Sequence, residues 1–318
     1  MSSGGGSSPS SPYSNSLRVV SPITRTPQDI IKEILNVDDE DEDTLTIRYM
    51  DDKEGGAGHN HVFYTLIEGD ERIFKIAHRT QDGAELINKE VEIYRQINAF
   101  PEEDKKYFFQ GVSGCLSNEQ NDQYPFRGYA ILVMPFLKGN DLQKILTRKP
   151  KPLLTDIYRI LKACAEALLI FLRHGISHGD IHLGNIFVLD TGEIKLFDFD
   201  SAGDPLGNPL NVIAKPITQT FNITRLKYNT IGVDRESYQR GFFPMCKIIF
   251  TYLNKLSILE ELNSYKHDIS TVDAAIQLYE SLIVFFKQKE KESQGGRRRK
   301  TKKRMKSRRT RLRRTRVA

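Results

Sequence analysis

Asp180, Asn185 and Asp198 have side chains that can bind a metal ion, and they lie close together in the sequence. Between Asn185 and Asp198, the apolar runs 186–189 and 194–197 flank Asp-Thr-Gly, which is typical of a tight β-hairpin turn. We therefore expect the carboxylates on loops at the two ends of a rigid strand pair. Oxygen ligands held in this way suit Mg²⁺, which takes one or two carboxylates and leaves room for substrate phosphates. The pattern indicates phosphoryl transfer.

The segment HGDIHLGN resembles the catalytic loop of the protein-kinase-like superfamily, and LFDFD resembles its Asp-Phe-Gly metal motif. The resemblance implies an ATP-dependent phosphotransferase with a two-lobed α+β fold. Its small lobe would have an antiparallel sheet and one helix, and its large lobe would be mainly helical. The resemblance also implies that Asp180 orients and deprotonates the acceptor hydroxyl and that Asn185 and Asp198 hold Mg²⁺. It places His182 near the γ-phosphate, where a Lys is usual.

Lys75 and Glu90 are the residues that this resemblance implies for holding the α- and β-phosphates. A kinase uses a cation on a strand for this purpose and an acid on a helix to orient that cation. Lys75 lies in RIFKI, which alternates as a strand does, and Glu90 lies in AELINKEVEIYRQI, whose apolar residues recur at helical spacing. Glu92, on the same predicted helix, is the alternative partner.

Upstream, GGAGHNHVFYTL resembles the phosphate-covering loop G-x-G-x-x-G-x-V of the family. Gly56 and Gly58 match, and His61 stands at the third glycine position. Glycines let the backbone approach the phosphates closely, so we expect a loop of altered shape. Strands are expected on both sides, over residues 44–50 and 62–68.

The site for the nucleotide base is expected in YAILVMPFLKGNDL, a buried strand followed by a linker into a helix. The resemblance implies that Met134 is the gatekeeper and that Pro135 to Leu137 form the hinge. Proline lacks an N–H, but its carbonyl can accept a hydrogen bond from the adenine amino group, and the Leu137 N–H can donate to the ring. Asp141 is expected either to bind the ribose hydroxyls or to serve as a helix N-cap.

Composition divides the chain into three segments. Residues 1–26 are rich in Ser, Gly and Pro, residues 291–318 are strongly basic, and both are expected to be disordered. The kinase-like domain is expected over residues 27–290, with the small lobe at about 27–134 and the large lobe at about 139–290. A domain of this size can bury a large core.

The large lobe is predicted to be smaller than in typical protein kinases. An apolar stripe over residues 157–172 predicts a buried helix that leads to the catalytic loop. Residues 234–253 resemble the helix that follows the activation segment, with Asp234 as its anchoring acid. No Ala-Pro-Glu motif precedes this helix, and few further helices are expected.

The three cysteines, Cys115, Cys164 and Cys246, are scattered, without a CxxC pair or a His cluster, which argues against disulfides and structural zinc. The sequence has no apolar run of 18 residues, and its Ser/Gly/Pro-rich start lacks the apolar core of a signal peptide. We therefore expect a reducing compartment, either the cytosol or the nucleus.

Between Arg297 and Arg316 the chain has 14 Lys or Arg residues and no acid. Since the whole chain has a net charge of +6, the residues outside this run together carry a net charge of −8. Such a run binds polyanions through counterion release, with little sequence preference. The alternatives are a nuclear-localisation signal, a nucleic-acid tether, an anionic-membrane contact and self-docking onto the acidic domain. The composition also resembles basic tails of giant-DNA-virus proteins. Together with the reduced size of the large lobe, this composition suggests a viral protein that is located in the host cytoplasm or nucleus or in the virion.

The phosphate acceptor is ambiguous from the sequence. Protein Ser/Thr kinases usually carry Arg before the catalytic Asp and Lys two residues after it, whereas this chain has Gly179 and His182. HGDxHxGN is similar to the loops of aminoglycoside phosphotransferases and choline kinases. The other motifs are closer to a protein kinase, which we favour; a small-molecule phosphotransferase and a catalytically silent scaffold are the alternatives. Asp200 replaces the motif glycine and either adds a metal ligand or caps a turn.

Overall fold

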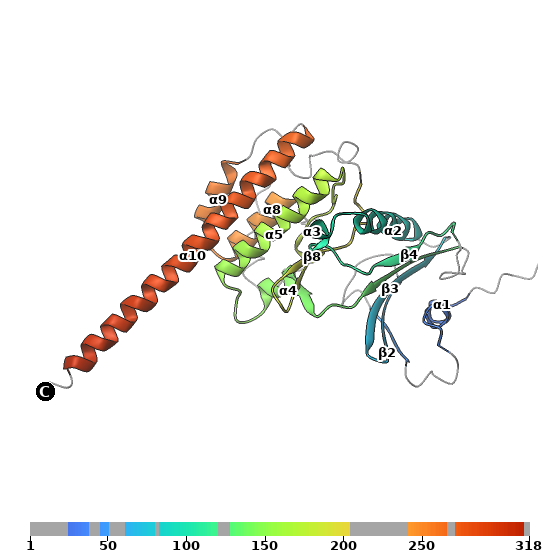
Figure 1. The fold of residues 1–318 in the computed structure, drawn as a ribbon, viewed down its shortest axis with the longest axis horizontal. Coiled ribbons are helices and arrows are strands. Elements are labelled where there is room, and N and C mark those ends of the chain that lie inside the picture. The colour runs from blue at the N-terminus through green and yellow to red at the C-terminus, as the bar shows by residue number, and fades with distance from the viewer. Residues whose placement is uncertain are drawn as a thin grey trace, which may run out of the picture.

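Two lobes follow one another along the chain, a small lobe built on strands and a large lobe built on helices (Figure 1). The predicted two-lobed α+β fold is confirmed. The computed structural model describes residues 25–37, 45–50, 61–79, 83–119, 128–203, 241–265 and 271–314. The predicted positions Gly56, Gly58 and Asp234 lie outside these residues.

The small lobe contains one antiparallel sheet of five strands in the order β1-β2-β3-β5-β4. The strands are β1 (Leu45–Tyr49), β2 (His61–Ile67), β3 (Asp70–His78), β4 (Ser113–Cys115) and β5 (Tyr129–Pro135). Lys75 of β3 pairs with Leu132 of β5 and with Val62 of β2, so it lies in the middle of the sheet. The predicted strands before and after the glycine loop are β1 and β2, each within one residue of the expected bounds.

Both faces of this sheet are covered by helices. Helix α2 (Ala84–Asn98) packs on the face that contains Leu132, whereas α1 (Pro27–Ile34) packs on the face that contains Phe74 and Ile76. Successive residues of a strand point to opposite faces, so Phe74 and Ile76 turn away from the side on which Lys75 lies. Helix α1 therefore packs against the face of β3 opposite to the Lys75 side chain.

Helix α1 was absent from the sequence-based prediction, which expected a single helix in this lobe. Its start carries a capping box, in which the Thr26 hydroxyl accepts from the Asp29 N–H and the Asp29 carboxylate accepts from the Thr26 N–H, and Pro27 occupies the first helical position. Ile30 and Ile31 are fully buried against the sheet. The segment TPQDII thus carried a readable helix signal.

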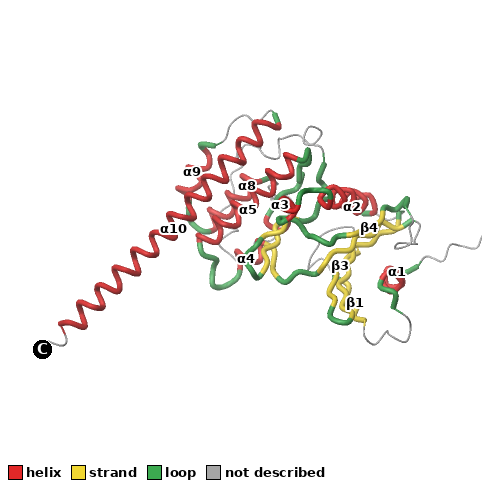
Figure 2. Tube along the Cα trace, viewed as in Figure 1, coloured by secondary structure: helices red, strands yellow, loops and turns green. Residues whose placement is uncertain are grey.

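The large lobe is mainly helical (Figure 2). The short α3 (Glu102–Lys105) precedes β4 in the chain. The elements of the large lobe are β6 (Gly139–Asp141), α4 (Leu142–Thr147), α5 (Leu154–Arg173), the 3₁₀ turn η2 (Leu183–Asn185), β7 (Ile186–Leu189), β8 (Ile194–Leu196), α8 (Phe242–Tyr252), α9 (Leu256–Asn263) and α10 (Val272–Arg314). The predicted hairpin is formed by β7 and β8, which pair antiparallel from Ile186↔Leu196 to Val188↔Ile194. The hairpin therefore lies between the two predicted metal ligands, Asn185 and Asp198, in the sequence.

Helix α5 lies at the centre of the large lobe, with α8 and α10 beside it (Figure 1). Aromatic rings join the three helices: Tyr158 of α5 contacts Phe250 of α8 and Phe286 of α10. Cys164 and Cys246 are buried free thiols in this core. The amphipathic stripe predicted for residues 157–172 therefore corresponds to the long central helix.

Helix α10 continues through residues 291–314, for which the sequence favoured a disordered tail. The helix runs through Gly295 and Gly296, which are poor helix formers, and no proline interrupts it; the Lys and Arg that follow are good helix formers. Only its first half packs against the lobe, and the second half extends away from α5, α8 and α9 (Figure 1). Within the residues described, no helix has the length and apolar character needed to span a bilayer.

Candidate active site

Lys75 lies between two carboxylates at the junction of the lobes. Its Nζ donates to Glu90 Oε2 at 2.8 Å and to Asp198 Oδ1 at 3.1 Å. The side chains of Lys75 and Glu90 are 12% and 1% exposed, so this ion pair is almost completely shielded from water. Glu92, the alternative partner, is exposed. The structure thus brings together three of the residues that the sequence singled out.

The charges in this cluster shift one another's protonation. Burial alone would lower the pKa of Lys75, but the Glu90 and Asp198 carboxylates outweigh it and raise that pKa. The nearby Lys75 charge lowers the pKa of Asp198, against a smaller opposing effect of burial. Burial raises the pKa of Glu90. Lys75 therefore stays cationic and Asp198 anionic, as binding to phosphate and to a metal ion requires.

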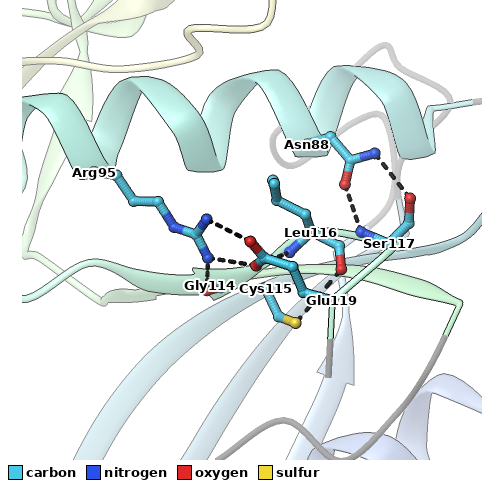
Figure 3. A network of polar contacts seen from close by, with 7 residues as sticks. All are labelled: Asn88, Arg95, Gly114, Cys115, Leu116, Ser117 and Glu119. Atoms are coloured by element: carbon cyan, nitrogen blue, oxygen red, sulfur yellow. Dashed lines mark hydrogen bonds and ion pairs between the residues drawn. The ribbon is translucent and has the colours of Figure 1, made fainter. Parts of the chain in front are cut away.

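Glu90 is held in place because α2 is fastened to the segment after β4 (Figure 3). The Arg95 guanidinium donates to both carboxylate oxygens of Glu119 at 3.0 and 2.6 Å and to the Gly114 carbonyl at 3.3 Å. About two turns earlier in α2, the Asn88 side chain donates to Ser117 Oγ at 2.9 Å and accepts from the Ser117 N–H at 2.8 Å. Because Arg95 and Asn88 each make two or more hydrogen bonds to the segment at and after β4, rotation of α2 is limited.

The catalytic-loop segment is organised by short-range hydrogen bonds. Asn185 Nδ2 donates to the Asp180 carbonyl at 2.9 Å, and the Gly184 N–H donates to His182 Nδ1 at 3.0 Å. Because Nδ1 accepts, a neutral His182 ring carries its proton on Nε2, which lies 3.9 Å from Asp180 Oδ2. Gly179 has φ +76°, a left-handed backbone conformation that glycine adopts without strain. These contacts place Asp180, His182 and Asn185 in one loop.

An aromatic column behind the site was not predicted from the sequence. The Phe199 ring lies 5.1 Å from Tyr94 of α2 and 5.2 Å from His178 of the catalytic loop. Burial lowers the pKa of His178 to about 4, so the imidazole is neutral at neutral pH. Tyr94 follows Glu90 by one helical turn on the buried face of α2, and that spacing was the available signal. The column links the small lobe to the catalytic loop.

The segment around Asp198 has an unusual backbone. Asp198 has φ +65°, which is uncommon outside glycine, and strain of this kind gathers at functional sites. Phe199, the next residue, is fully buried. Burial and the charge of Asp198 raise the pKa of Asp200, which is half-buried beside Ser201. The main-chain N–H of Phe197 donates to the Asn185 carbonyl at 3.4 Å, which brings the two predicted metal ligands to the same place.

Parts of the chain are similar to known proteins. Residues 126–222, under a third of the chain, match the model of the ABC1 atypical kinase-like domain. The chain is also 34% identical over 91 residues to "Serine/threonine-protein kinase PknA" of Mycobacterium tuberculosis, covering 29% of this chain and 20% of that protein. The chain therefore contains a segment similar to protein-kinase-like domains. Its matched segment includes the catalytic loop and Asp198.

A second relative of the kinase-like domain is "DNA damage-responsive serine/threonine-protein kinase RqkA" of Deinococcus radiodurans, 31% identical over 135 residues. That alignment covers 38% of this chain and 19% of the relative, so the chain spans about a fifth of the length of both proteins. The similarity thus supports a kinase-like phosphotransferase domain. The relatives named here give no support to a viral origin.

In the kinase-like domain, Met134 is buried at the end of β5, next to the linker between the lobes. The Phe136 N–H donates to the Glu71 carbonyl of β3 at 2.9 Å and fixes the first turn of that linker. Pro135 and Leu137 on either side are half-buried. The Asp141 carboxylate accepts from the Lys144 N–H at 2.7 Å, so it serves as the N-cap of α4.

The residues of the kinase-like domain fit a magnesium ion. Asn185 uses its side-chain nitrogen as a donor to Asp180, which leaves its amide oxygen as the atom able to bind a cation, and Asp198 is an anionic carboxylate. Among the described residues, no three His, Cys, Asp or Glu side chains form a cluster that could hold a metal ion. A site with one carboxylate and one amide oxygen suits Mg²⁺ completed by phosphate and water oxygens.

Proposed function

We propose that this chain transfers the γ-phosphate of ATP to a Ser or Thr hydroxyl of a protein. The observation that carries this proposal is the position of Lys75, whose ammonium contacts both the buried Glu90 and Asp198. A lysine oriented by a helix glutamate beside a metal-binding aspartate is the arrangement that phosphoryl transfer from ATP requires. The similarity to two Ser/Thr kinases supports a protein acceptor.

Asp180, Asn185 and Asp198 have separate roles in this proposal. Asp180 accepts the hydrogen bond of the acceptor hydroxyl and takes its proton as the hydroxyl oxygen bonds to the γ-phosphorus, while the bond from that phosphorus to the β-phosphate oxygen breaks and ADP leaves. Asn185 and Asp198 would hold Mg²⁺, which would neutralise charge on the phosphate oxygens. Lys75 holds the α- and β-phosphates, and the Nε2–H of His182 donates to the γ-phosphate.

The base and ribose of ATP are proposed to bind between the lobes. The Pro135 carbonyl accepts from the adenine amino group, the Leu137 N–H donates to the ring, and Met134 closes the back of the pocket. Asp141 holds the ribose in addition to capping α4. Gly56 and Gly58 cover the phosphates from the β1–β2 loop.

Radiolabelled ATP tests the proposal. Wild-type protein should label itself or a generic basic protein, and Asp180→Asn should lose about 10²- to 10⁴-fold of this activity while binding ATP normally. Asp190→Asn is the matched control, because Asp190 is an exposed residue of the β7–β8 turn. Absence of both an ATP-dependent thermal shift and transfer in the wild type would leave only the scaffold hypothesis.

A small-molecule phosphotransferase is the second candidate, and the catalytic loop favours it. Gly179 and His182 stand where protein Ser/Thr kinases usually carry Arg and Lys, and Gly179 adopts a backbone conformation suited to glycine. A panel of amino alcohols and aminoglycosides, run beside the protein panel, separates the candidates. Turnover of a small alcohol without protein labelling would overturn the protein-kinase proposal and leave the phosphotransferase mechanism intact.

A further inference from the structure

The second half of α10 is a helix made mainly of basic residues. Between residues 297 and 314 it carries 13 Lys or Arg and no acid. Its first half is anchored: Tyr279 and Phe286 contact Phe242 of α8, and Lys289 pairs with Glu261 of α9 at 2.5 Å. The basic half, residues 297–314, is called the basic arm below. It projects from the large lobe as the continuation of a packed helix (Figure 1).

We propose that the basic arm binds duplex DNA along the phosphate backbone, with little sequence preference. An α-helix rises 1.5 Å per residue, so the arm is about 27 Å long and carries one positive charge per about 2 Å. Duplex DNA carries one negative charge per about 1.7 Å of its axis. The two charge densities match closely. The B-form major groove, about 12 Å wide, also admits an α-helix.

The residue types in the arm favour duplex DNA over other polyanions. Most of its basic residues are Arg, whose planar guanidinium matches phosphate geometry better than an ammonium does. It contains no aromatic residue, on which the bases of a single strand would stack. The major groove of duplex RNA is deep and narrow, which disfavours entry of a helix.

A membrane surface is disfavoured by the distribution of apolar residues. An interfacial helix needs a broad apolar face with large side chains. The arm has two apolar residues, Met305 and Leu312, which share a narrow stripe with Thr301 at 100° per residue. Basic positions occupy the rest of the circumference. This pattern suits a partner that surrounds the helix, as the walls of a groove do.

Fluorescence anisotropy with the full-length chain tests the proposal, using a duplex of about 20 base pairs as the probe. Affinity should fall by about 10³-fold or more between 50 and 200 mM salt, as expected for at least six phosphate contacts. Deletion of residues 295–318 should abolish binding. Met305→Pro keeps every charge but interrupts the helix, and it should weaken binding about tenfold relative to Met305→Ala.

Each alternative has its own outcome in the same experiment. Equal affinity of Met305→Pro and Met305→Ala would overturn the helical arm, and equal affinity for a single strand of the same length would overturn the preference for a duplex. Tighter binding to phosphatidylserine vesicles than to DNA would assign the arm to membranes. If the deletion leaves DNA affinity unchanged and raises kinase activity at low salt, the arm instead docks on the acidic domain. The binding measurements do not depend on catalysis.

Discussion

The two halves of the site differ in how closely they follow a protein kinase. In the nucleotide half, Lys75 lies between Glu90 and Asp198, as the family pattern implies. The acceptor half departs from it, since Gly179 and His182 replace Arg and Lys. The conventional half is buried and paired, whereas the divergent half is a loop fixed by local hydrogen bonds. Phosphate binding and acceptor choice therefore rest on separable parts of the structure.

The contrast also bears on regulation. In the nucleotide half, Arg95 and Asn88 fasten α2 to the segment after β4, in the position where Glu90 contacts Lys75. In the acceptor half, glycine at position 179 supplies no guanidinium for a phosphorylated activation segment. Together these features favour a domain whose site is ready without activation-segment phosphorylation.

The largest effect is expected for Asp198, the residue shared by both halves. Asp198→Ala removes the anionic metal ligand and one partner of Lys75, so transfer should fall by about a thousandfold, or about 4 kcal/mol. Mg²⁺-dependent ATP binding, measured by calorimetry, should weaken as well. Asp190→Ala is the control. If Asp198→Ala binds Mg-ATP as tightly as the control, the metal-ligand role of Asp198 is wrong.

The packing of α1 against the sheet that carries Lys75 is tested at Ile31. Ile31→Ala removes a fully buried side chain between α1 and the sheet, and should lower the free energy of unfolding by about 2–4 kcal/mol. Because Phe74 and Ile76 flank Lys75 on that sheet, ATP affinity should drop too. Glu33→Ala, on the exposed side of α1, should cost under about 1 kcal/mol. Equal urea midpoints for the two variants would show that α1 contributes little.

The acceptor half is tested through the pH dependence of His178. Its pKa is about 4 in the folded protein and about 6.5 when unfolded, so the unfolded state binds the proton more readily. The stability that the protein gains by burying a neutral His178 is therefore fully present above about pH 6.5. As the pH falls toward 4, protonation of the unfolded state lowers the free energy of unfolding by up to about 3 kcal/mol. Urea unfolding at about pH 7 and about pH 5 should show a loss near 2 kcal/mol that His178→Leu lacks. A variant with the wild-type pH slope would contradict the assignment.

The smallest effect is expected at Asp141, on the edge of the nucleotide half. Asp141→Ala should cost about 1 kcal/mol of stability through the lost N-cap, whereas Asp141→Asn should cost almost nothing, because Asn caps equally well. If Asp141 also holds the ribose, both variants should bind ATP about tenfold more weakly. Unchanged ATP affinity in both would restrict Asp141 to capping.

Local patterns predicted much of the fold. The alternation of β3, the helical stripe of α2 and the Asp-Thr-Gly hairpin each depend on neighbours in sequence, so the elements were placed within a few residues. Glu90 falls in the apolar stripe of α2 and Glu92 falls outside it, which periodicity alone could have decided. Helix α1 was missed although its capping box was visible, because eight residues give a weak periodic signal.

The sequence by itself determined which side chains could do chemistry, because the motif residues and their order define Lys75, Asp180, Asn185 and Asp198. Only the tertiary structure decided how they meet. The Phe199 column joins residues that are far apart in the chain, and the clamp from Arg95 to Glu119 fixes the helix that carries Glu90. Such contacts depend on how separately formed elements pack, and packing energy is distributed over many residues with no local signature. The charge of the basic arm was likewise explicit in the sequence, whereas its helical continuation from a packed α10 was decided by the fold.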